Sequence, residues 1–74
     1  MPKLRPAKPV EVKRLLEKLG FRFLRQSGSH AVYRHPNGRW TTVPIHRGKD
    51  VAKGTLRNII KDTGLTVEEF QAMR

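Results

Sequence analysis

An Asn-Gly pair between two alternating segments constrains the fold of this chain more than any other feature of its sequence. Asn37-Gly38 separates HAVYRH, residues 30–35, from RWTTVPIH, residues 39–46. Such a pair is a strong hairpin signal, because both residues accept the positive φ angles of a tight turn. We therefore predict two antiparallel strands joined at this pair. Because Pro44 has no N–H to donate, we expect the second strand to have an open edge at Pro44 or to end there.

The rest of the chain supplies one further strand and the helices. FRFLRQ, residues 21–26, alternates and leads into the turn SGS, in which Gly28 can take a positive φ. The apolar spacing predicts a helix over residues 9–19 and a second over residues 55–64. A short final helix over residues 66–74 opens with a capping box.

The predicted order is α-β-β-β-α-α. Three antiparallel strands with helices on one face form a two-layer α+β sandwich, and this order and size are similar to those of a double-stranded-RNA-binding-like domain. A chain of 74 residues makes one domain, which we expect to occupy residues 9–74. Residues 1–8 combine prolines with cations and are expected to form a flexible basic arm.

A two-residue loop at Asn37-Gly38 also predicts the register of the hairpin. Val32 then faces Val43. His30 faces Ile45 and lies at the rim of the side that meets the helices. A shift of one residue would exchange the two sides of the hairpin.

The charge of the chain is its strongest bulk signal. Sixteen Lys and Arg residues against six Asp and Glu give a net charge of +10, spread along the whole sequence. A folded domain with this imbalance attracts polyanions, of which nucleic acid is the usual one. The alternative is an acidic protein partner or an association with the ribosome.

Several classes of site and location are disfavoured by composition. Without cysteine there are no disulfides and no thiolate zinc sites, which fits a reducing compartment. No apolar run is long enough to span a membrane and no signal peptide is evident, so we expect a cytoplasmic protein with no membrane partner. A core this small leaves little room for a cofactor, and we expect none.

Histidine is the residue best suited to catalysis in this chain. The acidic residues are too scattered for a two-metal site, and the histidines lack zinc spacing, so no metal is expected. Ser27 or Ser29 beside His30 could suggest a nucleophile and its base, but strand neighbours point to opposite faces. RNA carries its own nucleophile, the 2′-OH, and its cleavage needs a base, an acid and cations. An imidazole among cations can make either proton transfer near neutral pH, although a histidine can equally be an ordinary surface residue.

Five segments in order carry a family resemblance. They are LLEKLGF (15–21), GSH (28–30), TVPIH (42–46), KGTLRNII (53–60) and GLTVEEF (64–70). The series resembles the HicA family of mRNA interferase toxins over about residues 10–70. The resemblance implies a double-stranded-RNA-binding-like fold, cleavage of mRNA during stress with inhibition of translation, and a cognate HicB antitoxin. The catalytic histidine of the family, in Gly-Ser-His, corresponds to His30.

The residues around His30 have structural and functional alternatives. Gly28 is a turn residue, and its missing side chain could also let a phosphate approach. Ser29 could cap the turn or offer its N–H or hydroxyl to a phosphate. His46 lies opposite Ser29 in the predicted register, close to His30, and is a candidate second proton carrier.

Other residues are candidates for contacts with RNA. Lys49 and Lys53 flank the start of the second long helix, and with Arg34 they are expected to bind RNA phosphates. The alternative for the lysines is a solvated, charged helix entry. Tyr33 and Trp40 fall on the outer side of the predicted hairpin, where they could stack bases, contact a partner or pack across strands.

The sequence thus favours a metal-independent endoribonuclease toxin of a type II pair, with His30 as general acid or base. A non-catalytic RNA-binding module of the same fold is the alternative, and a module that binds acidic proteins is a third. The expected partners are mRNA and an acidic HicB-like antitoxin. We expect the antitoxin to cover residues 28–30 near Lys49 and Lys53, and to leave Tyr33 and Trp40 uncovered.

Overall fold

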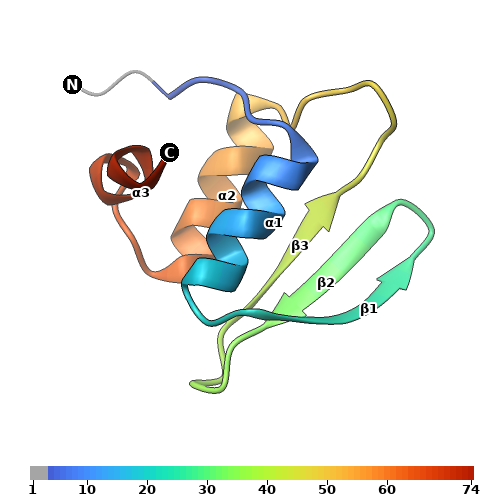
Figure 1. Ribbon diagram of the computed structural model, residues 1–74, viewed down its shortest axis with the longest axis horizontal. Coiled ribbons are helices and arrows are strands. Elements are labelled where there is room, and N and C mark those ends of the chain that lie inside the picture. Colours follow the sequence, from blue (N-terminus) through green and yellow to red (C-terminus); the bar gives the residue numbers. More distant parts are fainter. Residues whose placement is uncertain (1–3) are drawn as a thin grey trace.

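The computed structural model describes residues 4–74, which form three helices and three strands (Figure 1). The elements are α1 (Pro9–Lys18), β1 (Arg22–Ser27), β2 (His30–Arg34), β3 (Trp40–Pro44), α2 (Lys53–Thr63) and α3 (Val67–Met73). This order confirms the sequence prediction, and each boundary lies within two residues of the expected one.

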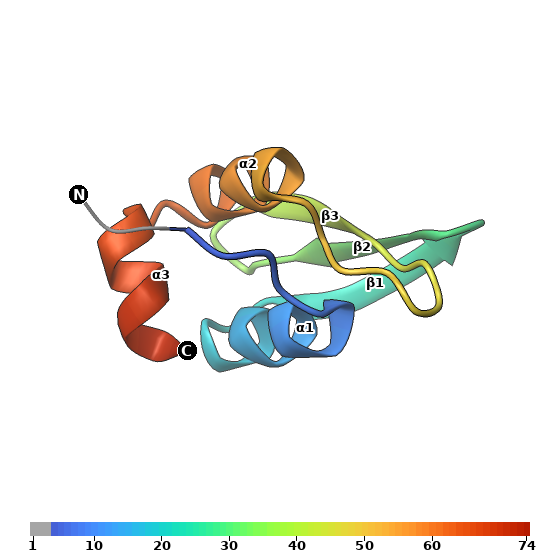
Figure 2. The ribbon, with the colours of Figure 1, turned by 90° about the horizontal axis from the view of Figure 1, so that it is seen from above.

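The strands form one antiparallel sheet in the order β1-β2-β3, and the helices pack against one of its faces. Figure 2 shows α3 at the end of the molecule farthest from the β1–β2 turn. The two layers are the predicted α+β sandwich, and they are consistent with a double-stranded-RNA-binding-like fold. No helix within residues 4–74 is long and apolar enough to cross a membrane.

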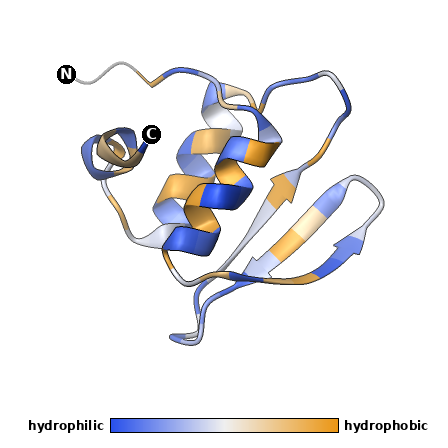
Figure 3. Ribbon diagram, in the orientation of Figure 1, coloured by the Kyte–Doolittle hydropathy of each residue, from blue (hydrophilic) through white to orange (hydrophobic). Residues whose placement is uncertain are grey.

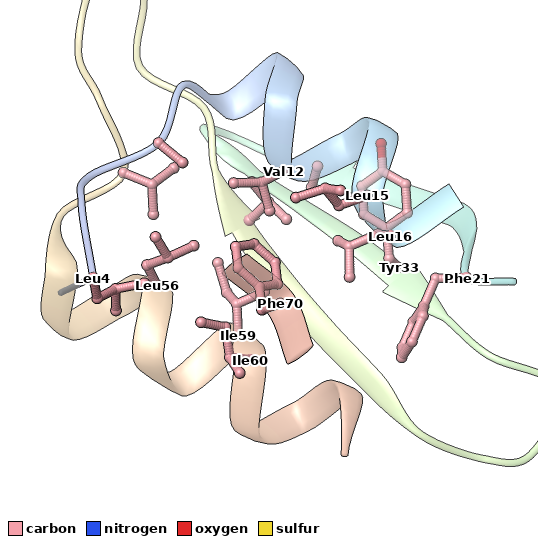
Figure 4. Packing of buried hydrophobic residues seen from close by; sticks show 14 residues of the cluster. Leu4, Val12, Leu15, Leu16, Phe21, Tyr33, Leu56, Ile59, Ile60 and Phe70 are labelled. Carbon is pink, nitrogen blue, oxygen red and sulfur yellow. The ribbon is translucent and has the colours of Figure 1, made fainter. Parts of the chain in front are cut away.

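The hydrophobic core lies between the helices and the sheet. Hydrophobic and hydrophilic residues alternate around α1 and α2, as expected for helices with one buried face (Figure 3). Figure 4 shows how the side chains of the two helices meet those of the sheet. The buried hydrophobic residues are Leu4, Ala7, Val12, Leu15, Leu16, Phe21, Ala31, Tyr33, Val43, Val51, Leu56, Ile59, Ile60 and Phe70. Every residue of β1 is exposed, so the core is built on β2 and β3.

The short helix α3 closes the core at one end. Its predicted capping box is confirmed: the Thr66 amide donates to Glu69 Oε1 at 2.8 Å, and the Glu69 amide donates to Thr66 Oγ1 at 3.1 Å. Phe70 is fully buried among the core residues. The Arg74 guanidinium then pairs with both carboxylate oxygens of Glu11 on α1, at 3.0 and 3.1 Å. These contacts attach the end of the chain to the first helix.

The described part of residues 1–8 packs on the domain, which differs from the flexible arm expected for it. Leu4 and Ala7 are buried in the core. The Ala7 amide donates to the Val51 carbonyl at 3.4 Å, and the Val51 amide donates to the Ala7 carbonyl at 2.7 Å. Proline prevents a helix in such a segment but does not prevent burial of the apolar residues between the prolines. Residues 1–3, the rest of the expected arm, lie outside the described residues.

The β2–β3 hairpin has a three-residue loop, and the predicted register is wrong by one residue. The His35 amide donates to the Arg39 carbonyl at 2.7 Å, and the His35 carbonyl accepts from the Gly38 amide at 2.9 Å. Pro36 therefore takes the second position of a β-turn, and Gly38 ends that turn with a φ of 96°. Proline and glycine are favoured at those two positions, so Pro36, Asn37 and Gly38 form the loop together.

Two side chains stabilise this loop. Asn37 Oδ1 accepts from the Arg39 amide at 2.8 Å, and the Asn37 amide donates to His35 Nδ1 at 3.0 Å. Because Nδ1 accepts, the imidazole carries its proton on Nε2, which donates to the Leu19 carbonyl at 3.1 Å. The imidazole also packs edge-on against Phe21, with ring centroids 5.1 Å apart. His35 thus connects the loop to the end of α1.

The observed register exchanges the two faces of the hairpin. His30 faces Pro44 instead of Ile45, and it lies on the outer face instead of the rim of the core. Tyr33 was expected on the outer face, but it lies in the core and is 2% exposed. Trp40 lies on the outer face as expected, and it is now on the same face as His30.

Burial of Tyr33 predicts a loss of stability at alkaline pH. Burial first, and then the nearby Glu17 carboxylate, raise the pKa of the Tyr33 phenol above its ordinary value of 10.0. The folded protein therefore holds this proton more tightly than the unfolded chain does. The resulting stabilisation is complete below pH 10.0 and is lost as the pH rises through the folded-state pKa.

The variant Tyr33→Phe keeps the buried ring and removes the ionisation. We expect the free energy of unfolding, measured by urea denaturation, to fall more steeply above pH 10.0 in the wild type than in this variant. At neutral pH the difference between the two proteins should not change with pH. Parallel declines above pH 10.0 would show that the phenol is not buried as described.

Candidate functional site

The outer face of the sheet is left uncovered by the helices and carries exposed side chains from all three strands. Directly opposite residues of paired strands point to the same face, so the observed register determines which residues share this face. They are Arg22, Arg25, Ser27, His30, Val32, Arg34, Trp40, Thr42 and Pro44. The indole of Trp40 is the most exposed of the large hydrophobic side chains, at 61%.

Two cations face each other on this surface. Arg22 lies directly opposite Arg34 across β1 and β2, and Arg25 lies farther along β1, opposite Val32. Like charges at directly opposite positions lower the stability of a sheet. A polyanion bound on this face would relieve the repulsion, so the arrangement suits a surface that meets phosphates.

A β-bulge in β1 brings Leu24 to the side of Arg25. The register shifts between Phe23 and Arg25, and a bulge turns a side chain out of the normal alternation. Leu24 and Arg25 line a shallow hollow of about 470 Å³ together with Val32, Arg34, Gly38 and Trp40. We refer to it as the arginine hollow.

A second hollow, of about 480 Å³, lies between β3 and α2, and we refer to it as the His30 hollow. Its lining residues include His30, Trp40 and Thr42 from the sheet and Thr55, Asn58 and Asp62 from α2. Trp40 lines both hollows. Its exposed indole therefore separates the arginines of the first hollow from the polar residues of the second.

His30 is positioned by the turn that precedes it. Ser27 pairs with His30, which leaves Gly28 and Ser29 as a two-residue turn. Gly28 has a φ of 57°, as the first residue of such a turn requires, and a Cβ there would meet nothing within 4 Å. The Ser29 carbonyl accepts from the Ile45 amide at 2.6 Å. The turn thus fixes the start of β2, where the imidazole is exposed.

His46 is not brought beside His30. Ile45, and not His46, lies opposite Ser29. The His46 side chain lines a separate hollow between α1 and the β3–α2 connection, with Lys8, Lys13, Arg47 and Lys49 among its neighbours. The prediction that placed the two histidines together depended on the wrong register.

The three cations predicted to bind RNA lie in three different places. Arg34 lines the arginine hollow beside Trp40. Lys49 lines the hollow that contains His46. Lys53 is the exposed first residue of α2 and is not among the lining residues of either hollow on the sheet.

Asp62 is the acidic residue of the His30 hollow. Its Oδ2 accepts from the Thr41 hydroxyl at 2.9 Å, and its carbonyl oxygen accepts from the Arg39 guanidinium at 3.4 Å. These bonds hold the end of α2 against β3. One carboxylate with one imidazole does not form a metal site, and residues 4–74 contain no group of three or more such ligands.

The α2 side of this hollow is the part that sequence reasoning missed. Thr55, Asn58 and Asp62 are spaced so that they share one face of a helix. This polar stripe is visible in the sequence as a pattern. Its position beside β3 depends on the tertiary packing of α2, which the pattern does not reveal.

Comparison with known families gives one result that covers most of the chain. Residues 10–65 match the family model described as the HicA toxin of bacterial toxin-antitoxin systems. No curated protein matches the chain in a sequence comparison. The family match includes the turn before His30, the whole sheet and α2. The chain therefore belongs to the HicA toxin family of bacterial toxin-antitoxin systems.

Proposed function

We propose that the protein is an endoribonuclease that cleaves mRNA and inhibits translation, with His30 as general acid or base. The position of His30 carries the proposal. The imidazole is exposed on a sheet face that also holds Arg22, Arg25 and Arg34 and the exposed indole of Trp40. Proton-transfer groups and cations are needed to cleave RNA, and an exposed aromatic surface suits the binding of single-stranded RNA.

The proposed reaction uses the 2′-OH of the RNA as its nucleophile. The arginines of β1 and β2 bind phosphates and stabilise the negative charge that develops at phosphorus. The imidazole of His30 takes the proton of the 2′-OH or gives one to the leaving 5′ oxygen, and water makes the other of these two proton transfers. A bond forms between the 2′ oxygen and phosphorus, and the bond to the 5′ oxygen breaks. This route needs no metal ion.

The proposed partner is an acidic HicB-like antitoxin that acts in the cytoplasm, where mRNA is translated. The docking site expected from the sequence depended on the register that the structure corrects. Because His30 and Trp40 share the outer face, an inhibitor that covers the imidazole also covers the indole. Lys49 and Lys53 remain exposed cations that speed the encounter with an acidic partner.

A non-catalytic RNA-binding module of the same fold is the second candidate. The basic outer face supports it as well as it supports the nuclease. The two functions differ only in whether His30 transfers a proton, so a substitution of this residue distinguishes them.

The first test removes the imidazole. Because His30 is exposed, His30→Ala should keep the fold, as judged by circular dichroism, while RNA cleavage falls by about 10²–10⁴-fold. His46→Ala should cleave at the wild-type rate, because His46 lines a different hollow. Wild-type cleavage by His30→Ala would remove the proposed mechanism and favour the RNA-binding module.

The matched control is His35→Ala, which removes an imidazole from the opposite face of the same hairpin. It breaks the bonds to Leu19 and Asn37, so the free energy of unfolding should fall by about 1–3 kcal/mol. The folded fraction should still cleave RNA at the wild-type rate. This pair of variants separates a loss of stability from a loss of chemistry.

The second test identifies the products. A 2′-OH nucleophile leaves a 2′,3′-cyclic phosphate on one product and a 5′-OH on the other, with EDTA present throughout. An RNA with a single 2′-deoxy nucleotide at the cleavage position should resist cutting there. Products with 5′-phosphate ends, or a requirement for Mg²⁺, would instead indicate attack by an activated water.

The third test concerns the antitoxin. Trp40→Ala should raise the dissociation rate of the complex by about 30-fold, because a buried interface tryptophan commonly contributes 2 kcal/mol or more. Charge reversal of Lys49 and Lys53 should slow association, more strongly at low salt, with little change in dissociation. Both rates are measurable by surface plasmon resonance. If Trp40→Ala dissociates at the wild-type rate, the inhibitor does not cover the outer face.

A further inference from the structure

The His30 hollow combines three kinds of surface within one small space. It has an exposed indole from β3, a polar stripe from α2, and the imidazole at the start of β2. The side-chain amide of Asn58 makes no hydrogen bond with another residue among residues 4–74. The carboxylate of Asp62, by contrast, is held in place by the Thr41 hydroxyl at 2.9 Å. The hollow therefore offers fixed and free polar groups beside an aromatic face.

This combination suits a nucleobase better than a phosphate. Every base has a flat face that stacks on an aromatic ring, and an edge that carries hydrogen-bonding groups. A carboxylate repels phosphate but accepts from the N–H groups of a base edge. The cations that suit a phosphate, Arg25 and Arg34, line the hollow on the other side of Trp40.

We propose that the His30 hollow binds one base of a single-stranded RNA, stacked on Trp40 with its edge toward Asn58 and Asp62. The neighbouring phosphates then run toward the arginine hollow, and the linkage next to the bound base lies beside His30. This inference deepens the proposed nuclease function and rests on it. It makes Trp40 a residue that binds any base and Asn58 a determinant of where the RNA is cut.

The chemistry of the α2 residues selects a class of base. Asp62 can only accept hydrogen bonds, and Asn58 can both donate and accept. Adenine, cytosine and guanine carry an exocyclic amino group that donates to a carboxylate. Uracil has carbonyl oxygens on both sides of its single N–H, and a carboxylate repels them. The hollow should therefore prefer an amino-bearing base over uracil.

The first experiment observes stacking directly. Trp40 is the only tryptophan of the chain, so its fluorescence reports on bases that stack against this one indole. The His30→Ala protein is titrated with short oligoribonucleotides of adenosine, of cytidine and of uridine, and with a chain of abasic residues. Fluorescence anisotropy of a labelled end measures binding independently. Adenosine and cytidine oligomers should quench the indole, uridine should quench it less, and the abasic chain should bind without quenching.

The second experiment measures cleavage preference with an otherwise active protein. Asn58→Ala should reduce the preference for an amino-bearing base over uracil at the position next to the cut, by about tenfold. Trp40→Ala should lower kcat/KM on every RNA by about tenfold or more. Arg57→Ala is the control, because Arg57 is on α2 but does not line the hollow. It should leave the base preference unchanged.

The outcomes distinguish a failure of the proposed base site from a failure of the proposed nuclease function. If the RNA binds without quenching, or if Asn58→Ala keeps the wild-type base preference, no base binds in this hollow. If Trp40→Ala cleaves RNA normally and only the antitoxin complex weakens, the hollow belongs to the inhibitor interface and the inference is wrong. If adenosine quenches the indole but the wild type cleaves no RNA, the base site is upheld and the nuclease function fails.

Discussion

The structure depends on the turn that joins β2 and β3. The bond between the His35 carbonyl and the Gly38 amide, at 2.9 Å, makes the loop three residues long and so fixes the pairing of the two strands. Because side chains alternate along a strand, this pairing sends Tyr33 and Val43 into the core. One residue more or less in the loop would put His30 against the helices and remove the core residues of the sheet.

The same turn determines what the other face can do. With apolar residues directed inward, the outward positions of three strands hold His30, Trp40 and the arginines of β1 and β2. The bulge at Leu24 brings that residue to the arginine hollow, and α2 adds a polar border along β3. The core residues and the residues of the proposed site are therefore divided between the two faces of one small sheet. Repulsion between Arg22 and Arg34 reduces stability on the face that we propose binds RNA.

Local signals in the sequence predict the helices and strands well. The features that the sequence does not predict depend on contacts between segments that are far apart in the chain. The helix periodicity, the capping box of Thr66 and the turn glycines act within a few residues, so the element order was predicted correctly. Asn37-Gly38 alone predicts a two-residue loop, whereas Pro36 before it favours the three-residue loop that the structure has. Burial of Leu4 and the approach of α2 to His30 depend on packing between segments far apart in the sequence, which no local pattern records.

The central claim is that the outer sheet face is the RNA-binding face, and an NMR titration of the wild-type protein tests it most directly. The RNA carries 2′-O-methyl groups, which remove the nucleophile and prevent cleavage. The account predicts that signals of the Trp40 indole, the His30 imidazole and the Val32 methyl groups shift together, while those of the Val43 methyl groups do not. Shifts confined to the hollow around His46 and Lys49, with the Trp40 indole unchanged, would contradict it.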